Sequence, residues 1–299
     1  MPSPIFRGAR AASVVCDVGG VATMIAARPS GLPASFVKRS LTAVVGIPIF
    51  VWIVMGAPRF VLTALIVALS GIAAWELMRM FEQAGRPGYT RLGVVGAAAV
   101  TASFAAAPGV TPIVFTLAVV AVLSAPIWLD VAPAVEPAAA TLLAVVYVGW
   151  LLGHALVLGM LADGAGLLLF LVGITWAGES AAYVVGSTMG KRPLAGVISP
   201  RKTVEGAAGQ LVASVVAAAL LGAWLLPAWS TTAALVAGAM LGVTGQVGDL
   251  VESVMKRSLG AKDTGGLIPG HGGALDRLDG LLFNAPALFY YASWVGGRG

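Results

Sequence analysis

Two pairs of carboxylates in the C-terminal half have the spacing of neighbours on one face of a helix. Asp276 and Asp279 lie three residues apart, as do Asp249 and Glu252 upstream, and Glu179 interrupts an earlier apolar run. Residues three apart on a helix point to the same side. Carboxylates that converge repel one another unless a cation lies among them, and a hard divalent ion such as Mg²⁺ would meet that need.

Asp276 and Asp279 have a simpler alternative role, because acidic side chains in the first turn of a helix are stabilised by the helix dipole. The basic residues of the same block favour a functional site over capping alone. Enzymes that transfer phosphoryl or nucleotidyl groups use carboxylates to bind a metal ion and nearby basic side chains to bind phosphate. These cations are Lys256, Arg257, Lys262 and Arg277.

A second polar segment, 198–203, combines two cations with two hydroxyls directly before an apolar run. A turn that leads into a helix N-terminus is a ready anion site. The four residues concerned are Ser199, Arg201, Lys202 and Thr203. The segment therefore predicts a second contact with phosphate.

His271 lies in the sequence Pro269-Gly-His-Gly-Gly, where glycines let the backbone approach a ligand closely. We interpret it as a phosphate or nucleotide contact and not as a base, because a phosphate nucleophile is already ionised. His154, alone in an apolar run, is predicted to be a packing residue with satisfied hydrogen bonds. The role of Glu76, near the end of another apolar run, is left open.

The elements that must position these residues are apolar helices. The chain is 59% hydrophobic and only 10% charged, whereas soluble domains carry about 25% charged residues. Runs of about 20 apolar residues recur, each long enough to cross a bilayer. One cysteine, Cys16, excludes an internal disulfide. The sequence predicts an all-α polytopic membrane protein with about nine transmembrane helices, near 41–57, 60–80, 92–107, 110–129, 138–160, 166–186, 206–228, 232–252 and 276–295.

The basic residues indicate the orientation of these helices. With the N-terminus in the cytoplasm, all of the 18 Lys and Arg residues except Arg59 and Arg298 fall on the inner side. The loops 187–205 and 253–275 then both face the cytoplasm.

Because the basic residues do not form one patch, nucleic-acid binding is excluded. The expected organisation is a disordered basic cytoplasmic tail, N-terminal transmembrane helices and a C-terminal catalytic transmembrane region, at 1–38, 39–165 and 166–299.

The polar block as a whole resembles a known family signature. It reads Ser253-x-x-Lys256-Arg257, Lys262-Asp263, Pro269-x-His271-Gly-Gly and Asp276-Arg277-x-Asp279. This pattern closely resembles that of the phosphatidate cytidylyltransferases, the CDP-diacylglycerol synthases. Gly248-Asp249-Leu-x-Glu252 and Ser199-Pro-x-Lys202-Thr203 are similar to theirs as well. The chain departs from the family pattern at Glu179, Val204 and Ala274, where aspartate, tryptophan and a larger aliphatic residue are usual.

The resemblance implies that CTP and phosphatidate react to give CDP-diacylglycerol and pyrophosphate. It implies that Asp249, Asp276 and Asp279 hold Mg²⁺, with a second cation left open. The implied catalytic residues are Asp249, Lys256, Asp276, Arg277 and Asp279, and the implied substrate-binding residues are Ser199, Lys202, Thr203, Arg257, Lys262 and His271. The expected location is the cell inner (plasma) membrane, with the active site on the cytoplasmic face. A homodimer is left open.

Three other functions stay open on the residues alone. One is a different membrane lipid phosphotransferase, either a CDP-alcohol phosphotransferase or a CTP-dependent lipid kinase. The second is an ion-coupled transporter, since intramembrane acids such as Glu179 often mark ion paths. The third, a purely structural membrane protein, leaves the block of mixed charges unexplained.

Overall fold

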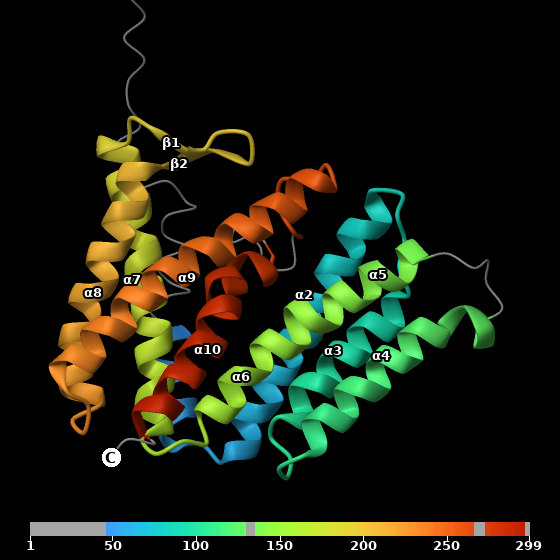
Figure 1. The fold of residues 1–299 in the computed structure, drawn as a ribbon, viewed down its shortest axis with the longest axis horizontal. Helices are drawn as coiled ribbons and strands as arrows, with labels where there is room; N and C mark the ends of the chain where they lie inside the picture. Colours follow the sequence, from blue (N-terminus) through green and yellow to red (C-terminus); the bar gives the residue numbers. More distant parts are fainter. Residues whose placement is uncertain (1–45, 130–134, 266–272, 297–299) are drawn as a thin grey trace, which may run out of the picture.

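The computed structural model describes residues 46–129, 135–265 and 273–296, and these residues are almost entirely helical (Figure 1). Apolar helices suit a chain of this composition, because a helix satisfies its own backbone hydrogen bonds where no water is available. The described strands are β1 (Pro193–Ala195) and β2 (Ser199–Thr203), which pair antiparallel in a short hairpin. The all-α prediction is therefore confirmed, apart from this hairpin.

The helices overlap the predicted apolar runs in order along the chain. Six of the described helices are long and apolar enough to cross a membrane, among them the 24-residue helix formed by α5, η1 and α6 without a break. The others of the six are α2, α4, α7, α8 and α9. The bounds are Gly46–Gly56 for the first helical segment, α2 Arg59–Gln83, α3 Thr90–Ser103, α4 Val110–Trp128, α5 Val135–Ala144, π-helical η1 Val145–Trp150, α6 Leu151–Leu158, α7 Gly164–Met189, α8 Val204–Leu225, α9 Thr231–Ser258 and α10 Leu275–Gly296.

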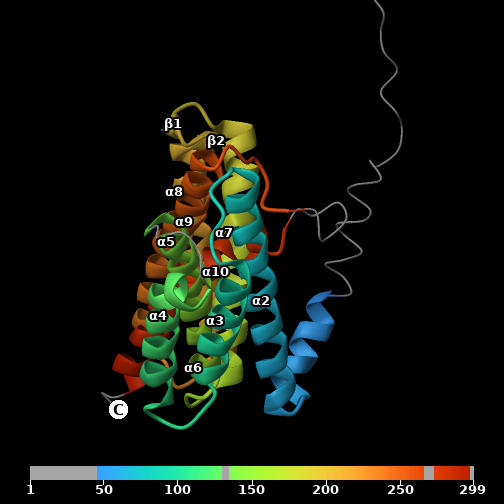
Figure 2. The same cartoon turned by 90° about the vertical axis from the view of Figure 1, so that its right-hand side faces the viewer.

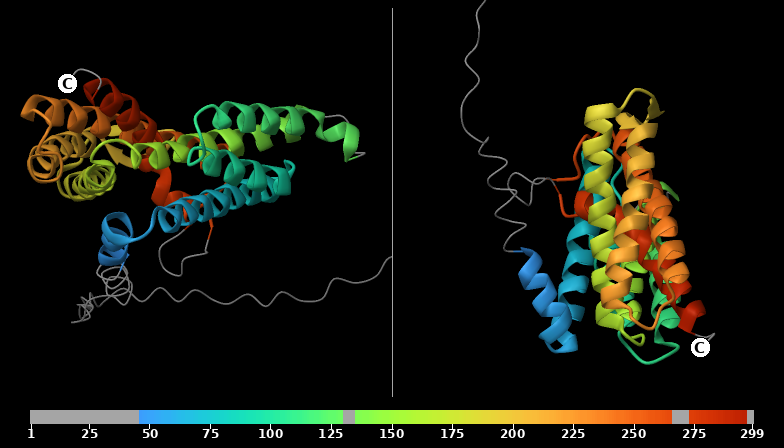
Figure 3. Two further views of the ribbon diagram at one scale, coloured as in Figure 1. Left: turned by 90° about the horizontal axis from the view of Figure 1, so that it is seen from below. Right: turned by 90° about the vertical axis from the view of Figure 1, so that its left-hand side faces the viewer.

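The hairpin and the C-terminal end of α10 lie at opposite ends of the bundle (Figures 1 and 3). The hairpin joins α7 to α8, which pack along each other, and α9 packs on α8. In Figure 2 the segment Gly46–Gly56 joins α2 at the outer edge of the bundle. The predicted tail, residues 1–38, lies outside the described residues.

Helix α10 packs between the helices of the N-terminal half and those of the C-terminal half of the bundle. It packs against α9 and α7 on one side and against α6 and α2 on the other. A buried polar link fixes it to its neighbours, since Asn284 Nδ2 donates to Thr175 Oγ1 of α7 (2.9 Å) and Thr244 of α9 donates to Asn284 Oδ1 (2.5 Å). Helices in an apolar environment use such hydrogen bonds to fix their relative positions.

Candidate active site

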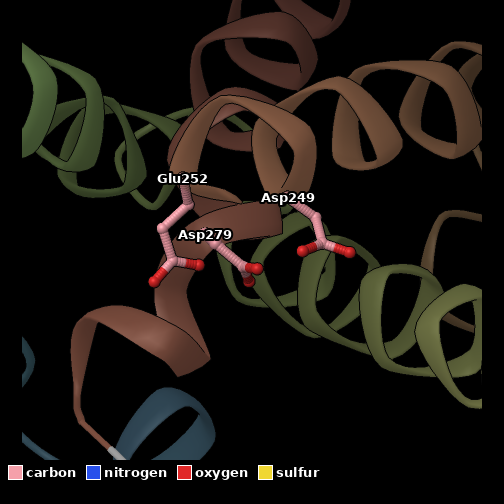
Figure 4. Close-up of side chains that lie close together, drawn as sticks. All are labelled: Asp249, Glu252 and Asp279. Atoms are coloured by element: carbon pink, nitrogen blue, oxygen red, sulfur yellow. The ribbon is translucent and has the colours of Figure 1, made fainter. Parts of the chain in front are cut away.

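Three carboxylates from α9 and α10 converge close to this helix crossing (Figure 4). Asp249 and Glu252 of α9 and Asp279 of α10 each offer an oxygen, and these oxygens lie within 4.8 Å of one another. Glu252 is fully buried and Asp279 is 8% exposed, whereas the Asp249 side chain is 34% exposed. The cluster is therefore accessible from the side of Asp249 and closed at Glu252.

The close approach of the two helices depends on a glycine beside the first carboxylate. A β-carbon at Gly248 would collide with the backbone oxygen of Asp279 and lie 3.2 Å from Phe283 Cδ2. Small residues at such crossings allow backbones to approach closely. Asp279 is held in turn by the backbone amide of Gly280, which donates to its Oδ1 (2.8 Å).

Two lysines from different segments flank the carboxylates. Lys202, in the hairpin, places Nζ 2.6 Å from Asp249 Oδ1 and 3.4 Å from Ser253 Oγ. Lys256, on α9, places Nζ 3.2 Å from Glu252 Oε1 and 2.8 Å from Asp276 Oδ1. The structure thus brings the two polar loops of the sequence to one site.

Asp276 lies outside the three-carboxylate cluster. Besides Lys256, its carboxylate accepts hydrogen bonds from Thr264 N (3.2 Å), Thr264 Oγ1 (2.9 Å) and Gly273 N (2.9 Å). These bonds join the loop after α9 to the first turn of α10. Sequence reasoning put Asp276 in the metal set and left Glu252 out, whereas Glu252 is the residue beside Asp249 and Asp279. Metal binding by Asp276 stays a prediction.

Most of the remaining predicted residues lie in the hairpin, at or just after the end of α9, and on the first turn of α10. Thr203 caps α8, because its hydroxyl oxygen accepts from Gly206 N (3.1 Å). Arg257 joins the hairpin to the end of α9, since its Nε donates to Ile198 O (3.3 Å). Ser199 lies in β2, Lys262 is exposed in the loop after α9, and Arg277 is exposed on the first turn of α10. His271 lies outside the described residues.

The structure shows the hydrogen-bond partners of two residues outside the polar block, His154 and Glu76. His154 is buried, with Nδ1 2.8 Å from Trp150 O and Nε2 3.2 Å from the Tyr290 hydroxyl, which confirms its prediction as a satisfied packing residue. Glu76, left open from the sequence, is buried and contacts the start of α10. Its position inside an apolar run was the available signal, because a charge there is costly without a specific partner.

The cluster fits a metal ion by its own chemistry. Neither oxygen of Glu252 has a partner in hydrogen-bonding geometry within the described part of the chain, although Lys256 lies close to Oε1. A buried carboxylate without hydrogen bonds is costly. A set of oxygen donors alone suits a hard cation such as Mg²⁺. Asp249, Glu252 and Asp279 could therefore hold a metal.

Comparison with known proteins places the chain in a family. A family model described as the cytidylyltransferase family matches residues 37–295. The phosphatidate cytidylyltransferase of Bacillus subtilis (strain 168) is 32% identical over 259 residues, which cover 85% of this chain and 96% of that protein. The chain belongs to the cytidylyltransferase family. The polar block and the carboxylate cluster fall within the matched residues.

Other proteins of similar sequence align over shorter stretches. The phosphatidate cytidylyltransferase of Synechocystis sp. is 47% identical over 118 residues, or 39% of each protein. The protein YnbB of Escherichia coli (strain K12), described as uncharacterized, is 41% identical over 156 residues, or 49% of this chain and 52% of YnbB. The chain thus spans about half the length or less of these two relatives.

Proposed function

We propose that this protein is a phosphatidate cytidylyltransferase that converts CTP and phosphatidate to CDP-diacylglycerol and pyrophosphate. The observation that carries the proposal is the cluster of Asp249, Glu252 and Asp279, with Lys202 and Lys256 beside it. This cluster lies in a chain of the cytidylyltransferase family whose helices include six that are long and apolar enough to cross a membrane. Carboxylates for a cation and lysines for phosphate are what transfer of a nucleotidyl group requires.

The reaction needs positioning and charge stabilisation more than proton transfer. An oxygen of the lipid phosphate forms a bond to the α-phosphorus of CTP, and the bond from that phosphorus to the β-phosphate breaks, so pyrophosphate leaves. The nucleophile is already ionised, and no side chain has to take a proton from it. A bound Mg²⁺ would supply positive charge to the triphosphate.

The proposed role of each side chain follows from its position in the site. Asp249, Glu252 and Asp279 would hold the cation, and a second cation is left open. Lys202 and Lys256 would face the phosphate oxygens from opposite sides of the cluster. Contacts of Ser199, Thr203, Arg257, Lys262, His271 and Arg277 with the two substrates stay predictions.

The proposal also specifies how the protein lies in the bilayer. It includes nine spans, a cytoplasmic N-terminus and an active site on the cytoplasmic face of the inner membrane, with 166–299 as the catalytic region. The Lys and Arg distribution supports this orientation. The acyl chains of phosphatidate would then enter from the inner leaflet while the head group reaches the cluster. A homodimer stays a prediction.

A direct assay tests the function. The purified protein in detergent receives CTP, phosphatidate and Mg²⁺, and the products are separated and identified. CDP-diacylglycerol and pyrophosphate in equal amounts are expected, with strong loss in Asp279→Asn. Transfer of the γ-phosphate with release of CDP would instead indicate a lipid kinase. The absence of any nucleotide-dependent product, or undiminished product from Asp279→Asn, would contradict the proposal.

A further inference from the structure

Glu76 of α2 reaches across the bundle to the first residues of α10. Its Oε1 accepts from Ala274 N (3.0 Å) and its Oε2 accepts from Leu275 N (2.8 Å). The side chain is only 1% exposed. A buried carboxylate in an apolar helix is costly, so these bonds offset a substantial desolvation penalty.

The start of α10 needs an acceptor from elsewhere. The first N–H groups of a helix have no partner within the helix and are usually capped by a neighbouring side chain. Ala274, which precedes Leu275 at the start of the helix, has no side-chain acceptor. Glu76 supplies both the acceptor and a negative charge that suits the positive end of the helix dipole.

The same carboxylate lies between two glycines of the preceding loop. A β-carbon at Gly265 would lie 3.1 Å from Glu76 Oε1, and one at Gly273 would lie 2.5 Å from Oε2. Thr264 Oγ1 lies 3.4 Å from Glu76 Oε2 and 2.9 Å from Asp276 Oδ2. Its single proton serves one acceptor at a time, and the shorter distance favours Asp276. Glu76 therefore packs against the loop on both sides of the segment 266–272.

Two routes connect this contact to the carboxylate cluster. Leu275 precedes Asp279 by about one helical turn, roughly 6 Å along α10. Anchoring the backbone of Leu275 therefore fixes the position of the Asp279 carboxylate along the axis of α10. The second route runs from the loop through Asp276 to Lys256, and from Lys256 to Glu252. A shift at the start of α10 would move Asp279 relative to Asp249 and would disturb the Lys256 contact beside the Glu252 side chain.

We propose that Glu76 is a positioning residue, which sets Asp279 against Asp249 and Glu252 in the geometry that binds a divalent cation. It touches neither the cation nor the substrates and acts through α10 and Lys256. The catalytic consequence rests on the proposed function, whereas the effect on cation binding does not.

Mn²⁺ alone is a suitable probe for this inference, because its binding to the purified protein can be titrated by electron paramagnetic resonance without turnover. Partners that hold metal ligands in place are typically worth 10–100-fold in metal affinity. We expect Glu76→Gln to raise the dissociation constant for Mn²⁺ at least about tenfold. The matched control is Glu82→Gln on the same helix, where the side chain is exposed and accepts from Thr90 Oγ1 (2.5 Å). This control should leave the constant unchanged.

A purely structural role would give a different result. Glu76→Gln would then lower the melting temperature or the yield, while the folded fraction bound Mn²⁺ within about twofold of the wild-type constant, and this outcome would overturn the inference. If Glu76→Gln does not fold, Glu76→Asp carries the test, since it keeps the charge but is shorter by one methylene, and it should also weaken Mn²⁺ binding. Wild-type protein that binds no Mn²⁺ would overturn the inference as well. Wild-type protein that binds Mn²⁺ but forms no CDP-diacylglycerol would contradict only the proposed function.

Discussion

Lys202 Nζ lies 2.6 Å from Asp249 Oδ1, so the hairpin between α7 and α8 is joined directly to the carboxylate cluster between α9 and α10. The pair is partly exposed, with 19% of the lysine side chain and 34% of the aspartate side chain accessible. Lys202 therefore neutralises Asp249 at the open edge of the cluster.

Lys202→Ala should lower kcat/KM for CTP by about 10²-fold, because a charge that stabilises transferring phosphates is removed. The measurement is the initial rate of CDP-diacylglycerol formation over a range of CTP concentrations. Lys191→Ala is the matched control, since Lys191 is exposed at the base of the hairpin and only its backbone amide bonds Glu205. Equal losses in both variants would show that the hairpin supplies general positive charge and not a specific contact.

Asp279→Asn and Glu252→Gln should abolish Mn²⁺ binding or weaken it by about 10²-fold or more, because each removes one of the three carboxylates proposed to hold the cation. Asp276→Asn should lower thermal stability and should weaken Mn²⁺ binding less than either of these changes, since its carboxylate accepts from Lys256, Thr264 and Gly273 and lies outside the cluster. Paired Mn²⁺ titrations and thermal melts separate the two effects. Loss of Mn²⁺ binding in Asp276→Asn with retention in Glu252→Gln would restore the metal set predicted from the sequence.

Gly248→Ala should reduce activity by about 10²-fold without removing any polar group. The added β-carbon would collide with the Asp279 backbone oxygen and force α9 and α10 apart. A displacement of about 1 Å in a catalytic site can cost that much. Gly71→Ala on α2 is the control, because a β-carbon there meets nothing within 4 Å. A Gly248→Ala protein with wild-type kcat would show that the site tolerates this separation.

Asn284→Leu should destabilise the protein by about 1 kcal/mol, which is typical of one hydrogen-bonded link between helices in a membrane. The loss is modest because the Thr175 hydroxyl still donates to Leu171 O (2.8 Å), and the Thr244 hydroxyl, freed from Asn284, can donate to Met240 O (2.9 Å). Thermal unfolding in detergent measures the change, and activity well below the melting temperature should be nearly retained. A stability equal to wild type would mean that packing alone aligns the three helices.

Local spacing predicted much of the site. Asp249 and Glu252 share a face of α9, as their i, i+3 spacing requires. Composition predicted the helical architecture, because apolar runs of this length favour helices that satisfy their own backbone. The same spacing rule failed to separate Asp276 from Asp279. The first lies where free amides at the start of α10 and in its loop need an acceptor, and the second lies one turn deeper, against α9.

Which helices meet was decided only by the tertiary structure. The periodicity of α2 does not indicate that Glu76 caps α10, and the polar hairpin does not by itself reveal Lys202 beside Asp249. Both contacts join residues far apart in the sequence, and both depend on how whole helices pack. The sequence alone determined that charged groups had to gather at one end of an apolar bundle. The packing of α10 against α2, α6, α7 and α9 decided which of them form the cluster, because the close approach at Gly248 brings Asp279, and not Asp276, beside Asp249 and Glu252.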